Sequence, residues 1–455
     1  MKKIATLILA AGKGTRMKSN LVKVLHPLMG APMLSFPIEV AKKVGSEKII
    51  VVIGYQGELI REKFETEGLV FVEQQEQLGT GHAVLCAKDS LKDFAGDVLI
   101  LCGDVPLLRE ETIRGLIGVH QRGGSKIAVL TTKLENPEGY GRIIRGDDNQ
   151  ILSIVEEKDA SDVERKVKEV NGGIYCADAR YLFHALQLVR RENKQSEYYL
   201  TDIVGLANEE NEKVLNFSAE DPFEAMGINT RVDLARVNEV IRKEMLTRLM
   251  MEGVSIIDPQ TTFIERDVQI GRDTVIYPNC YIRGTSVIGE ECILESGSTI
   301  TNCIIGDRVV IKSCCVINGS KVGSEVSLGP FAHLRPHTEL GAGVKIGNFV
   351  EIKKSKIGEG SKASHLTYLG DAVVGKGVNV GAGTITCNYD GTKKHQTTIE
   401  DNVFIGSDTQ FVAPVRIGEG AYIGAGSTIT RDVPSGCLAL SRAKQVIKNK
   451  KGEGK

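Results

Sequence analysis

Aliphatic residues recur at every sixth position through the C-terminal part of the chain. The period runs from residue 270 to 300, resumes from 322 to 352 after a slip, and returns from 405 to 429. Such a period fits neither an α-helix nor an alternating strand. It predicts a parallel β-helix of about ten coils, in which each hexad forms one side of a triangular coil and points its aliphatic residue inward. The periodic residues are Ile270, Ile276, Ile282, Ile288, Leu294, Ile300, Val322, Leu328, Leu334, Leu340, Ile346, Ile352, Ile405, Phe411, Ile417, Ile423 and Ile429.

The N-terminal half shows a different pattern, in which short apolar runs alternate with helical stretches. This alternation predicts an α/β domain with a mostly parallel sheet covered on both faces. Ligands in such domains bind at the carboxyl ends of the strands. The expected strands are Ala5–Ala10, Lys48–Ile53, Val98–Cys102 and Ile127–Thr131, and two of the expected helices are Pro32–Lys43 and His82–Ser90.

These patterns divide the chain into three parts. We expect an α/β domain over 1–229, a helical linker over 230–250, and the β-helix over 251–455, with a disordered tail after about residue 446. The linker should be an amphipathic helix about 30 Å long that acts as a rigid spacer. Its apolar residues lie four apart and are Val237, Ile241, Met245 and Leu249.

Composition narrows the class of protein. The net charge of −1 over 455 residues gives no case for binding nucleic acid or an anionic membrane. No apolar run approaches the roughly 20 residues that span a bilayer, so no membrane insertion is expected. The apolar run near the N-terminus leads into a Gly-rich loop, which favours a first strand over a signal peptide. The ten Cys lack metal-ligand spacing and are expected to be reduced thiols in the cytoplasm.

Two motifs follow predicted strands and carry possible chemistry. The loop after the first strand combines Gly12 and Gly14 with basic residues, which suits a phosphate, although an ordinary tight turn fits equally well. The loop matches neither a Walker A motif nor GxGxxG. Asp104 ends another strand in the run GDVP, where it could bind Mg²⁺ or simply form a turn.

The ordered set of motifs resembles the sugar-nucleotide nucleotidyltransferases. With the β-helix behind it, residues 3 to 445 resemble the family of bacterial bifunctional N-acetylglucosamine-1-phosphate uridylyltransferase/glucosamine-1-phosphate N-acetyltransferases. The resemblance implies a Rossmann-like nucleotidyltransferase domain followed by a left-handed parallel β-helix of hexapeptide repeats. The motifs are LILAAGKGTRM, LVKVLHPLMGAPML, EQLGTGHAV, CGDVPLL, GYGRI, VEEKDA, NGGIY and GINTR.

The resemblance implies roles for residues of the first half. Mg²⁺ would be held by Asp104 and Asn229, and these two residues and Gly103 would also contact the substrate. The uracil of UTP would be read by Gln74, Gly79 and Thr80. The sugar of N-acetylglucosamine-1-phosphate would be bound by Gly141, Glu156 and Asn171. The rest of the nucleotide would be bound by Leu9, Ala10, Ala11, Gly12, Lys13, Arg16 and Lys23.

The chemistry of this first site follows from charge. The sugar-1-phosphate oxygen is already anionic, so its attack on the α-phosphorus of UTP needs no general base. The metal, Arg16 and Lys23 would shield the repulsion between the two anions and align the attack. The chain departs from the usual family pattern at Val22, where many members carry Pro, and at Cys102, where many carry Tyr. Val22 is expected to loosen the loop without removing charge.

The hexad period breaks at KASHLTYLGDA and at NYDGTKKHQTT, and loops that leave the coil there could reach a neighbouring molecule. His365 lies in the first break. A single His is more often structural than catalytic, but the string resembles the acetyltransferase motif of the family, which implies that His365 is the general base. Glu351 is expected to orient it.

The resemblance also implies the remaining residues of the second site. Asn388 and Tyr389 would orient the substrate amine, stabilise the oxyanion and contact the cofactor. Glucosamine-1-phosphate would be bound by Arg335, Lys353, Tyr368 and Asn379, although many members carry Arg where this chain has His333. Acetyl-CoA would be contacted by Ala382, Ser407, Ala425 and Arg442.

The family resemblance further implies a homotrimer with acetyltransferase sites between subunits. Acetyl transfer would precede uridylyl transfer and yield UDP-N-acetylglucosamine for peptidoglycan and for lipopolysaccharide or teichoic acid. Two other hypotheses remain open. One is a glucose-1-phosphate adenylyltransferase whose β-helix only oligomerises or binds effectors, and the other is a non-enzymatic exchange-factor subunit of translation initiation. The β-helix of an adenylyltransferase would not need His365, Asn388 and Tyr389 in one site. An exchange-factor subunit would not need the phosphate-loop cations together with Asp104.

Overall fold

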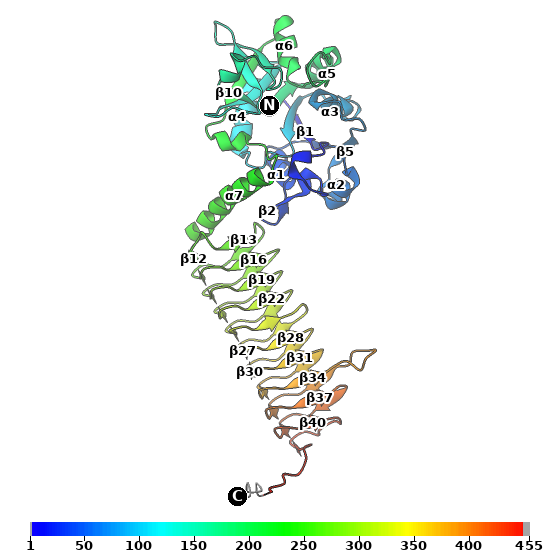
Figure 1. Cartoon of the computed structure of the whole chain (residues 1–455), viewed down its shortest axis with the longest axis vertical. Coiled ribbons are helices and arrows are strands. Elements are labelled where there is room, and N and C mark those ends of the chain that lie inside the picture. Colours follow the sequence, from blue (N-terminus) through cyan, green and yellow to red (C-terminus); the bar gives the residue numbers. More distant parts are fainter. Residues whose placement is uncertain (1, 449–455) are drawn as a thin grey trace, which may run out of the picture. The chain divides into compact units, whose positions relative to one another are not determined.

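A computed structural model describes residues 2–448 (Figure 1). The chain forms two compact units, Met1–Ile241 and Arg242–Lys455. The boundary falls inside helix α7 (Arg231–Met251), within the stretch predicted to be the linker. The predicted disordered tail lies mostly outside the described residues. Over the described part of the chain, no helix is both long and apolar enough to cross a membrane.

The first unit is built on one mixed sheet. Along its main path neighbouring strands are parallel except at β10, which runs antiparallel to both β6 and β7. The main order is β11 (Val214–Ser218), β7 (Ile127–Lys133), β10 (Glu169–Asp178), β6 (Asp97–Cys102), β1 (Ile4–Leu9), β4 (Lys48–Ile53) and β5 (Val70–Glu73). Strand β8 (Arg142–Arg145) pairs with β10 and β9 (Ile151–Val155), and a separate hairpin joins β2 (Pro27–Leu28) to β3 (Ala31–Pro32).

Helices cover both faces of this sheet, as predicted, because its central strands are apolar on both sides. One core packs α3, α5 and α6 against residues such as Leu7 and Val52. The other packs α1, α2 and α4 against residues such as Ile8 and Val51. The helices are α1 (Ser35–Lys43), α2 (Gly57–Lys63), α3 (Thr80–Cys86), α4 (Glu110–Gly123), α5 (Ala179–Leu188) and α6 (Asp202–Glu209).

The strand register places the two predicted motif loops together. Strands β1 and β6 are parallel neighbours, and their last residues, Leu9 and Cys102, pair directly. The Gly-rich loop and the Gly-Asp motif therefore leave the same edge of the sheet. This is the edge at which α/β domains bind their ligands.

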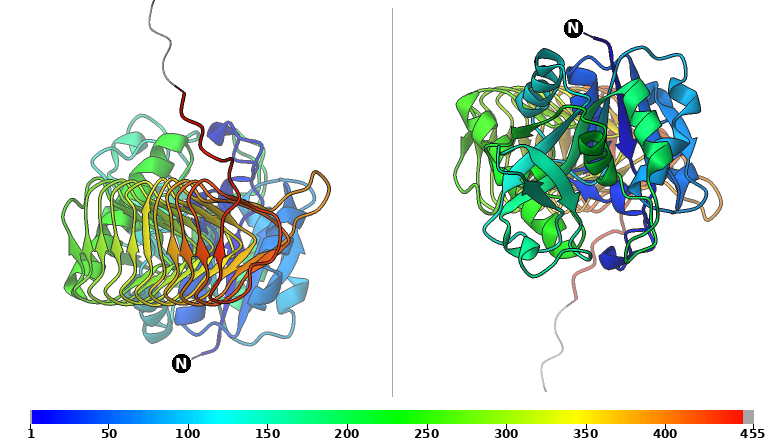
Figure 2. Two further views of the ribbon diagram at one scale, coloured as in Figure 1. Left: turned by 90° about the horizontal axis from the view of Figure 1, so that it is seen from below. Right: turned by 90° about the horizontal axis from the view of Figure 1, so that it is seen from above.

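The second unit is a parallel β-helix with three faces (Figures 1 and 2). The first face stacks β12 (Ser255–Ile256), β15 (Val275–Ile276), β18 (Ile293–Leu294), β21 (Val310–Ile311), β24 (Ser327–Leu328), β27 (Lys345–Asn348), β30 (Lys362–His365), β33 (Asn379–Val380), β36 (Phe404–Ile405), β39 (Tyr422–Ile423) and β41 (Leu438–Ala439). The second face stacks β13 (Phe263–Ile264), β16 (Tyr281–Arg283), β19 (Thr299–Thr301), β22 (Val316–Asn318), β25 (His333–Leu334), β28 (Glu351–Lys353), β31 (Tyr368–Gly370), β34 (Ile385–Cys387), β37 (Gln410–Val412) and β40 (Thr428–Ile429). The third face stacks β14 (Gln269–Ile270), β17 (Val287–Ile288), β20 (Ile304–Ile305), β23 (Lys321–Val322), β26 (Glu339–Leu340), β29 (Lys356–Ile357), β32 (Ala372–Val374), β35 (Thr397–Ile399) and β38 (Val415–Ile417).

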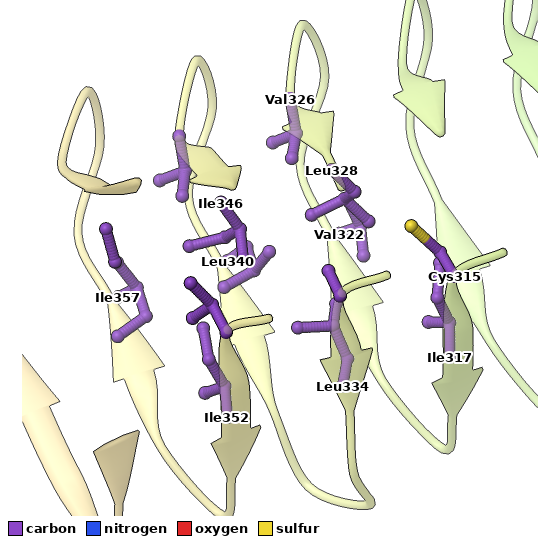
Figure 3. Packing of buried hydrophobic residues seen from close by; sticks show 14 of the residues in the cluster. Cys315, Ile317, Val322, Val326, Leu328, Leu334, Leu340, Ile346, Ile352 and Ile357 are labelled. Carbon is purple, nitrogen blue, oxygen red and sulfur yellow. The ribbon is translucent and has the colours of Figure 1, made fainter. Parts of the chain in front are cut away.

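The periodic aliphatic residues form the core of this β-helix, as predicted. Figure 3 shows them stacked inside successive coils. Ile270 is only half-buried but packs against the same core. The slip in the period also has a structural cause, since Leu294 pairs with Ile311 and Ile311 with Leu328, which makes these coils 17 residues long.

The two breaks in the period differ in structure. The first stays in the coil, where β30 and β31 are joined by a corner at Leu366 with a φ of 47°. The expectation of a projecting loop is therefore wrong at this break. The second break does leave the coil, as a loop after β34 in which Tyr389 and Lys394 form an antiparallel bridge (Figure 1, orange).

Helix α7 spans the stretch predicted to be the linker but buries a partly different set of residues. Val237, Ile241 and Leu249 are buried as expected. Leu246 is also buried, whereas the predicted Met245 is only half-buried. Leu246 and Leu249 belong to the core of the β-helix, so the end of α7 closes that core.

Candidate active sites

A cavity of about 330 Å³ lies at the carboxyl edge of β1 and β6. It brings together most of the residues predicted to bind the nucleotide, while Lys13 is exposed on the loop beside it. Gln77 and Glu197 also line it and were not predicted. The predicted residues that line it are Leu9, Ala10, Ala11, Gly12, Lys23, Gln74, Gly79, Thr80 and Asp104.

Charged and amide groups converge on Lys23 at one side of this cavity. The Lys23 ammonium forms an ion pair with the Asp104 carboxylate and lies 3.4 Å from Oδ1 of Asn229. Arg16 donates to the same Asn229 oxygen over 2.9 Å. Two hard oxygen donors, one of them a carboxylate, thus meet around a cation, and this donor set fits Mg²⁺ completed by phosphate oxygens and water. The described residues contain no cluster of three or more His, Cys, Asp or Glu side chains suited to a metal.

The loop that carries Lys23 is held by a side chain that the motif did not reveal. The backbone N–H of Val22 donates to Oε1 of Gln56 over 2.8 Å, and Gln56 Nε2 donates to the carbonyl of Asn20. A proline at position 22 could not make the first bond, because it has no N–H. This hydrogen bond holds the loop at the position where many family members carry proline.

Two glycines bring the backbone close to neighbouring carbonyl groups around the nucleotide loop. Gly103 donates its N–H to the carbonyl of Leu9 over 2.9 Å, and an added Cβ would lie 3.0 Å from that oxygen. Gly79 has a φ of 112°, and a Cβ there would meet the carbonyl of Tyr198 at 2.5 Å. Both contacts keep the backbone close to the cavity, which explains the predicted importance of these residues.

The three residues predicted to bind the sugar lie together. Asn171 donates its backbone N–H to the carbonyl of Gly141 over 2.9 Å. A Cβ on Gly141 would lie 3.6 Å from Cβ of Asn171 and 3.7 Å from Oε2 of Glu156. Burial raises the pKa of Glu156, and the hydrogen bond from Thr201 only partly offsets this.

Cys102 connects the cavity to this sugar-binding group. Its Sγ donates to the carbonyl of Gly173 over 3.4 Å, and Gly173 donates its N–H to Oδ1 of Asn171. Burial, reinforced by the charge of Asp104, raises the pKa of the Cys102 thiol to about 12. The thiol therefore stays neutral and serves as a hydrogen-bond donor where many family members carry Tyr.

In the second unit, cations gather on the second face of the β-helix. The strand register places Arg335 and Lys353 in adjacent coils. The next position in the same column is Gly370, where a Cβ would collide with the Tyr368 hydroxyl and lie 2.8 Å from Nδ2 of Asn388. The missing side chain at Gly370 thus leaves space for two residues that were predicted to bind the substrate.

The projecting loop adds a cation that the sequence had not indicated. Lys394 and, more weakly, Arg335 lower the pKa of Lys353, which places these three positive groups near one another. Such a cluster suits the phosphate of a sugar phosphate. Asp390 accepts hydrogen bonds from the N–H groups of Thr392 and Lys393 and so fixes the loop that presents Lys394.

His365 lies at the corner between the first and second faces and is exposed. Its Nδ1 lies 2.7 Å from Oδ1 of Asn348, in the coil before it. Glu351 instead pairs with Arg335 over 2.9 Å. The expectation that Glu351 orients His365 is therefore wrong, and Asn348 takes that position.

The residues predicted to contact acetyl-CoA follow one another along this corner. Asp408 donates its N–H to the carbonyl of Ala382, and Gly426 donates to that of Ser407, so successive coils are joined there. Arg442 donates to the carbonyl of Ala425 over 2.9 Å. Asn388 is buried and donates to Asp371, whereas Tyr389 is exposed at the base of the loop.

The residues predicted to form the acetyltransferase site therefore lie on two faces of the β-helix. Arg335, Lys353, Tyr368 and Asn388 lie on the second face or at its end, whereas Asn379 lies on the first face. His365 stands at the corner between them.

Three family models match the chain. The MobA-like NTP transferase domain matches residues 6–189. The bacterial transferase hexapeptide (six repeats) matches residues 396–431, and the GMPPB C-terminal domain matches residues 253–342. The first match lies in the first unit, and the other two lie in the second unit.

Relatives match over nearly the whole chain. A protein of Pelobacter propionicus, named bifunctional protein GlmU, is 53% identical over 98% of this chain and 97% of its own length. Proteins of the same name from Geotalea daltonii and Geobacter metallireducens are 54% and 53% identical, over 99% of this chain and 99% and 98% of their own lengths. This chain belongs to the family of bifunctional GlmU proteins.

Proposed function

We propose that this enzyme makes UDP-N-acetylglucosamine in two steps. The β-helix transfers an acetyl group from acetyl-CoA to glucosamine-1-phosphate, and the α/β unit then transfers a uridylyl group from UTP to the product, releasing pyrophosphate. The observation that carries the proposal is the presence of both kinds of site in one chain. In the first unit, Lys23 contacts both Asp104 and Asn229, and the second unit carries both His365, paired with Asn348, and a group of cations on its second face.

In the uridylyl step, positively charged groups allow two anions to meet. Asp104 and Asn229 would hold Mg²⁺, which supplies charge neutralisation at the reacting phosphates when bound. Lys23 contacts both of these oxygen-bearing side chains and Arg16 contacts that of Asn229, so their charges lie beside the proposed triphosphate site. The sugar phosphate needs no deprotonation, and the residues contribute alignment and electrostatic stabilisation.

In the acetyl step, His365 takes the proton that the substrate amine loses as it attacks the thioester. Nδ1 of His365 donates a hydrogen bond to Oδ1 of Asn348, so the ring proton stays on Nδ1 and the lone pair is on Nε2. The amine forms a bond to the acetyl carbon, the C–S bond breaks, and CoA leaves as the thiol. Arg335, Lys353 and Lys394 would bind the phosphate of glucosamine-1-phosphate.

We further propose that the β-helix assembles as a homotrimer. Three large apolar residues, Phe331, Phe349 and Leu366, occupy successive positions at the corner that carries His365, and they are 50%, 55% and 63% exposed. All three have positive φ, and the two Phe rings stack with centroids 5.4 Å apart. Bulky residues adopt this conformation at a cost, which burial against neighbouring copies would offset. A neighbouring copy would also complete the divided acetyltransferase site.

The proposal is tested by following both products with purified protein. Pyrophosphate release from UTP and N-acetylglucosamine-1-phosphate should require Mg²⁺, and thiol release from acetyl-CoA should require glucosamine-1-phosphate. Pyrophosphate release from ATP and glucose-1-phosphate should be slow. An adenylyltransferase would instead use these two substrates efficiently. Absence of both activities would favour a non-enzymatic role. We place these reactions in the cytoplasm, where UTP and acetyl-CoA are available.

A further inference from the structure

Gln74 has both of its amide protons occupied by protein groups. Nε2 donates to the carbonyl of Gly79 over 3.1 Å and lies 3.1 Å from Nδ1 of His82. A carbonyl can only accept, so the NH₂ side of the amide must face Gly79. The Oε1 atom is consequently directed away from both partners, on a residue that lines the nucleotide cavity.

His82 is the acceptor for the second of these protons. Because Nδ1 accepts from Gln74, the ring proton resides on Nε2, which lies 3.9 Å from Sγ of Cys86. Burial raises the pKa of the Cys86 thiol, so this neighbour is neutral. The ring is half-buried near Tyr198, and His82 is not among the residues that line the cavity. Any effect of His82 on the nucleotide therefore passes through Gln74.

We propose that His82 is a positioning residue that sets the enzyme's preference for UTP over CTP. It fixes the amide of Gln74 so that Oε1 accepts a hydrogen bond from N3–H of uracil. Cytosine presents a lone pair at N3, which would face the Oε1 lone pairs without a proton between them. An amide free to rotate could instead offer its NH₂ group to cytosine. This inference rests on the proposed uridylyl transfer.

Two substitutions at one position provide the test. His82→Leu keeps a side chain of similar bulk but removes the acceptor, whereas His82→Asn can place its Oδ1 near the position of Nδ1. We would measure kcat and KM for UTP and for CTP with N-acetylglucosamine-1-phosphate and Mg²⁺, together with the thermal midpoint. His82→Leu should lower the UTP:CTP ratio of kcat/KM roughly fivefold, as expected for one lost hydrogen bond, mainly through KM. His82→Asn should keep a ratio close to that of the unmodified enzyme.

The inference would be overturned if the UTP:CTP ratio of kcat/KM were unchanged in His82→Leu, or if it fell equally in His82→Leu and His82→Asn. Either result would mean that His82 only packs against its neighbours. Gln74→Leu serves as the second variant and should lose the preference. If Gln74→Leu retains it, the base is read elsewhere and the inference fails, while UTP-dependent pyrophosphate release by the unmodified enzyme still supports the proposed function. If the unmodified enzyme releases no pyrophosphate from UTP, the proposed function itself fails.

Discussion

Nδ1 of His365 lies 2.7 Å from Oδ1 of Asn348, one coil earlier in the β-helix. Because an amide oxygen only accepts, this contact places the ring proton on Nδ1 and leaves Nε2 as the base. The pairing comes from the strand register, in which Asn348 and His365 are direct partners between β27 and β30. A regular coil thus orients the proposed catalytic group.

Asn348→Leu should lower kcat for acetyl transfer roughly fivefold to tenfold, because the ring loses the hydrogen bond that selects its tautomer. The effect should be smaller than that of His365→Ala, which removes a base whose contribution is roughly 10²–10⁴-fold. Glu351→Gln is the control. It leaves the pair intact but disturbs Arg335, so it should raise KM for glucosamine-1-phosphate rather than lower kcat. An unchanged kcat in Asn348→Leu would contradict this account.

The two units should separate into active fragments, and the cut must respect the core of the β-helix. Leu246 and Leu249 belong to that core, so a fragment from residue 242 should be more stable than one from residue 251. Both should trimerise and acetylate glucosamine-1-phosphate, while residues 1–229 should remain monomeric. Thermal midpoints and sedimentation decide this. Equal midpoints for the two fragments that begin at residues 242 and 251 would show that the end of α7 contributes nothing to the core.

Replacing the apolar corner should dissociate the oligomer. In Phe331→Ser/Phe349→Ser, two side chains proposed to be buried between copies become polar, and completing the burial of each half-exposed ring is worth roughly 1 kcal/mol. Sedimentation at micromolar concentration should show monomers, with acetyl transfer lost and uridylyl transfer kept. Ile304→Ser, on the third face and 56% exposed, is the matched control and should remain trimeric. A double variant that still sediments as a trimer would place the interface elsewhere.

The first unit should also respond to pH through Asp202. Burial, with a smaller contribution from the charge of Asp159, raises the pKa of Asp202 to about 6. The folded protein therefore holds this proton more tightly than the unfolded chain, and its stability rises as pH falls from about 6 toward the ordinary value of 3.8. Asp202→Asn should raise the thermal midpoint by a few degrees at pH 7–8 and by progressively less below pH 6. Asp162→Asn, at a side chain 96% exposed, should show no such trend.

The architecture was predictable where the pattern is local and faces a core. Each hexad supplies its own inward residue, so the β-helix could be recognised before any contact was known. The direction of β10 could not, because an apolar run has the same pattern in a parallel and in an antiparallel strand. The boundaries of β4 were predicted as observed, whereas β7 extends two residues further than the apolar run suggested.

The sequence motifs identified many of the residues of the candidate sites. They did not predict which residues contact one another there. Gly12 and Asp104 stood out because Gly-rich loops and acidic residues after strands have recognisable chemistry. Asn348 lies in no recognisable motif, although a coil length of 17 residues would have placed it beside His365. Gln56 and Lys394 were missed because their roles depend on loops whose paths the sequence pattern does not specify. Val22 shows the same limit, since its bond to Gln56 is visible only in the fold.

The central claim is that one chain holds two independent sites that act in sequence. Asp104→Ala should lower pyrophosphate release roughly 10²–10³-fold by removing a carboxylate from the phosphate site, and it should leave acetyl transfer unchanged. His365→Ala should do the reverse. Neither variant should then make UDP-N-acetylglucosamine efficiently from glucosamine-1-phosphate, acetyl-CoA, UTP and Mg²⁺.

The most direct measurement is the formation of UDP-N-acetylglucosamine by an equimolar mixture of these two variants, each shown to have an unchanged thermal midpoint. The account predicts that the mixture restores product at a rate close to that set by the intact sites, because the acetylated sugar phosphate made by Asp104→Ala is used by His365→Ala. A mixture as inactive as its separate components, or an Asp104→Ala variant that has also lost acetyl transfer, would contradict it.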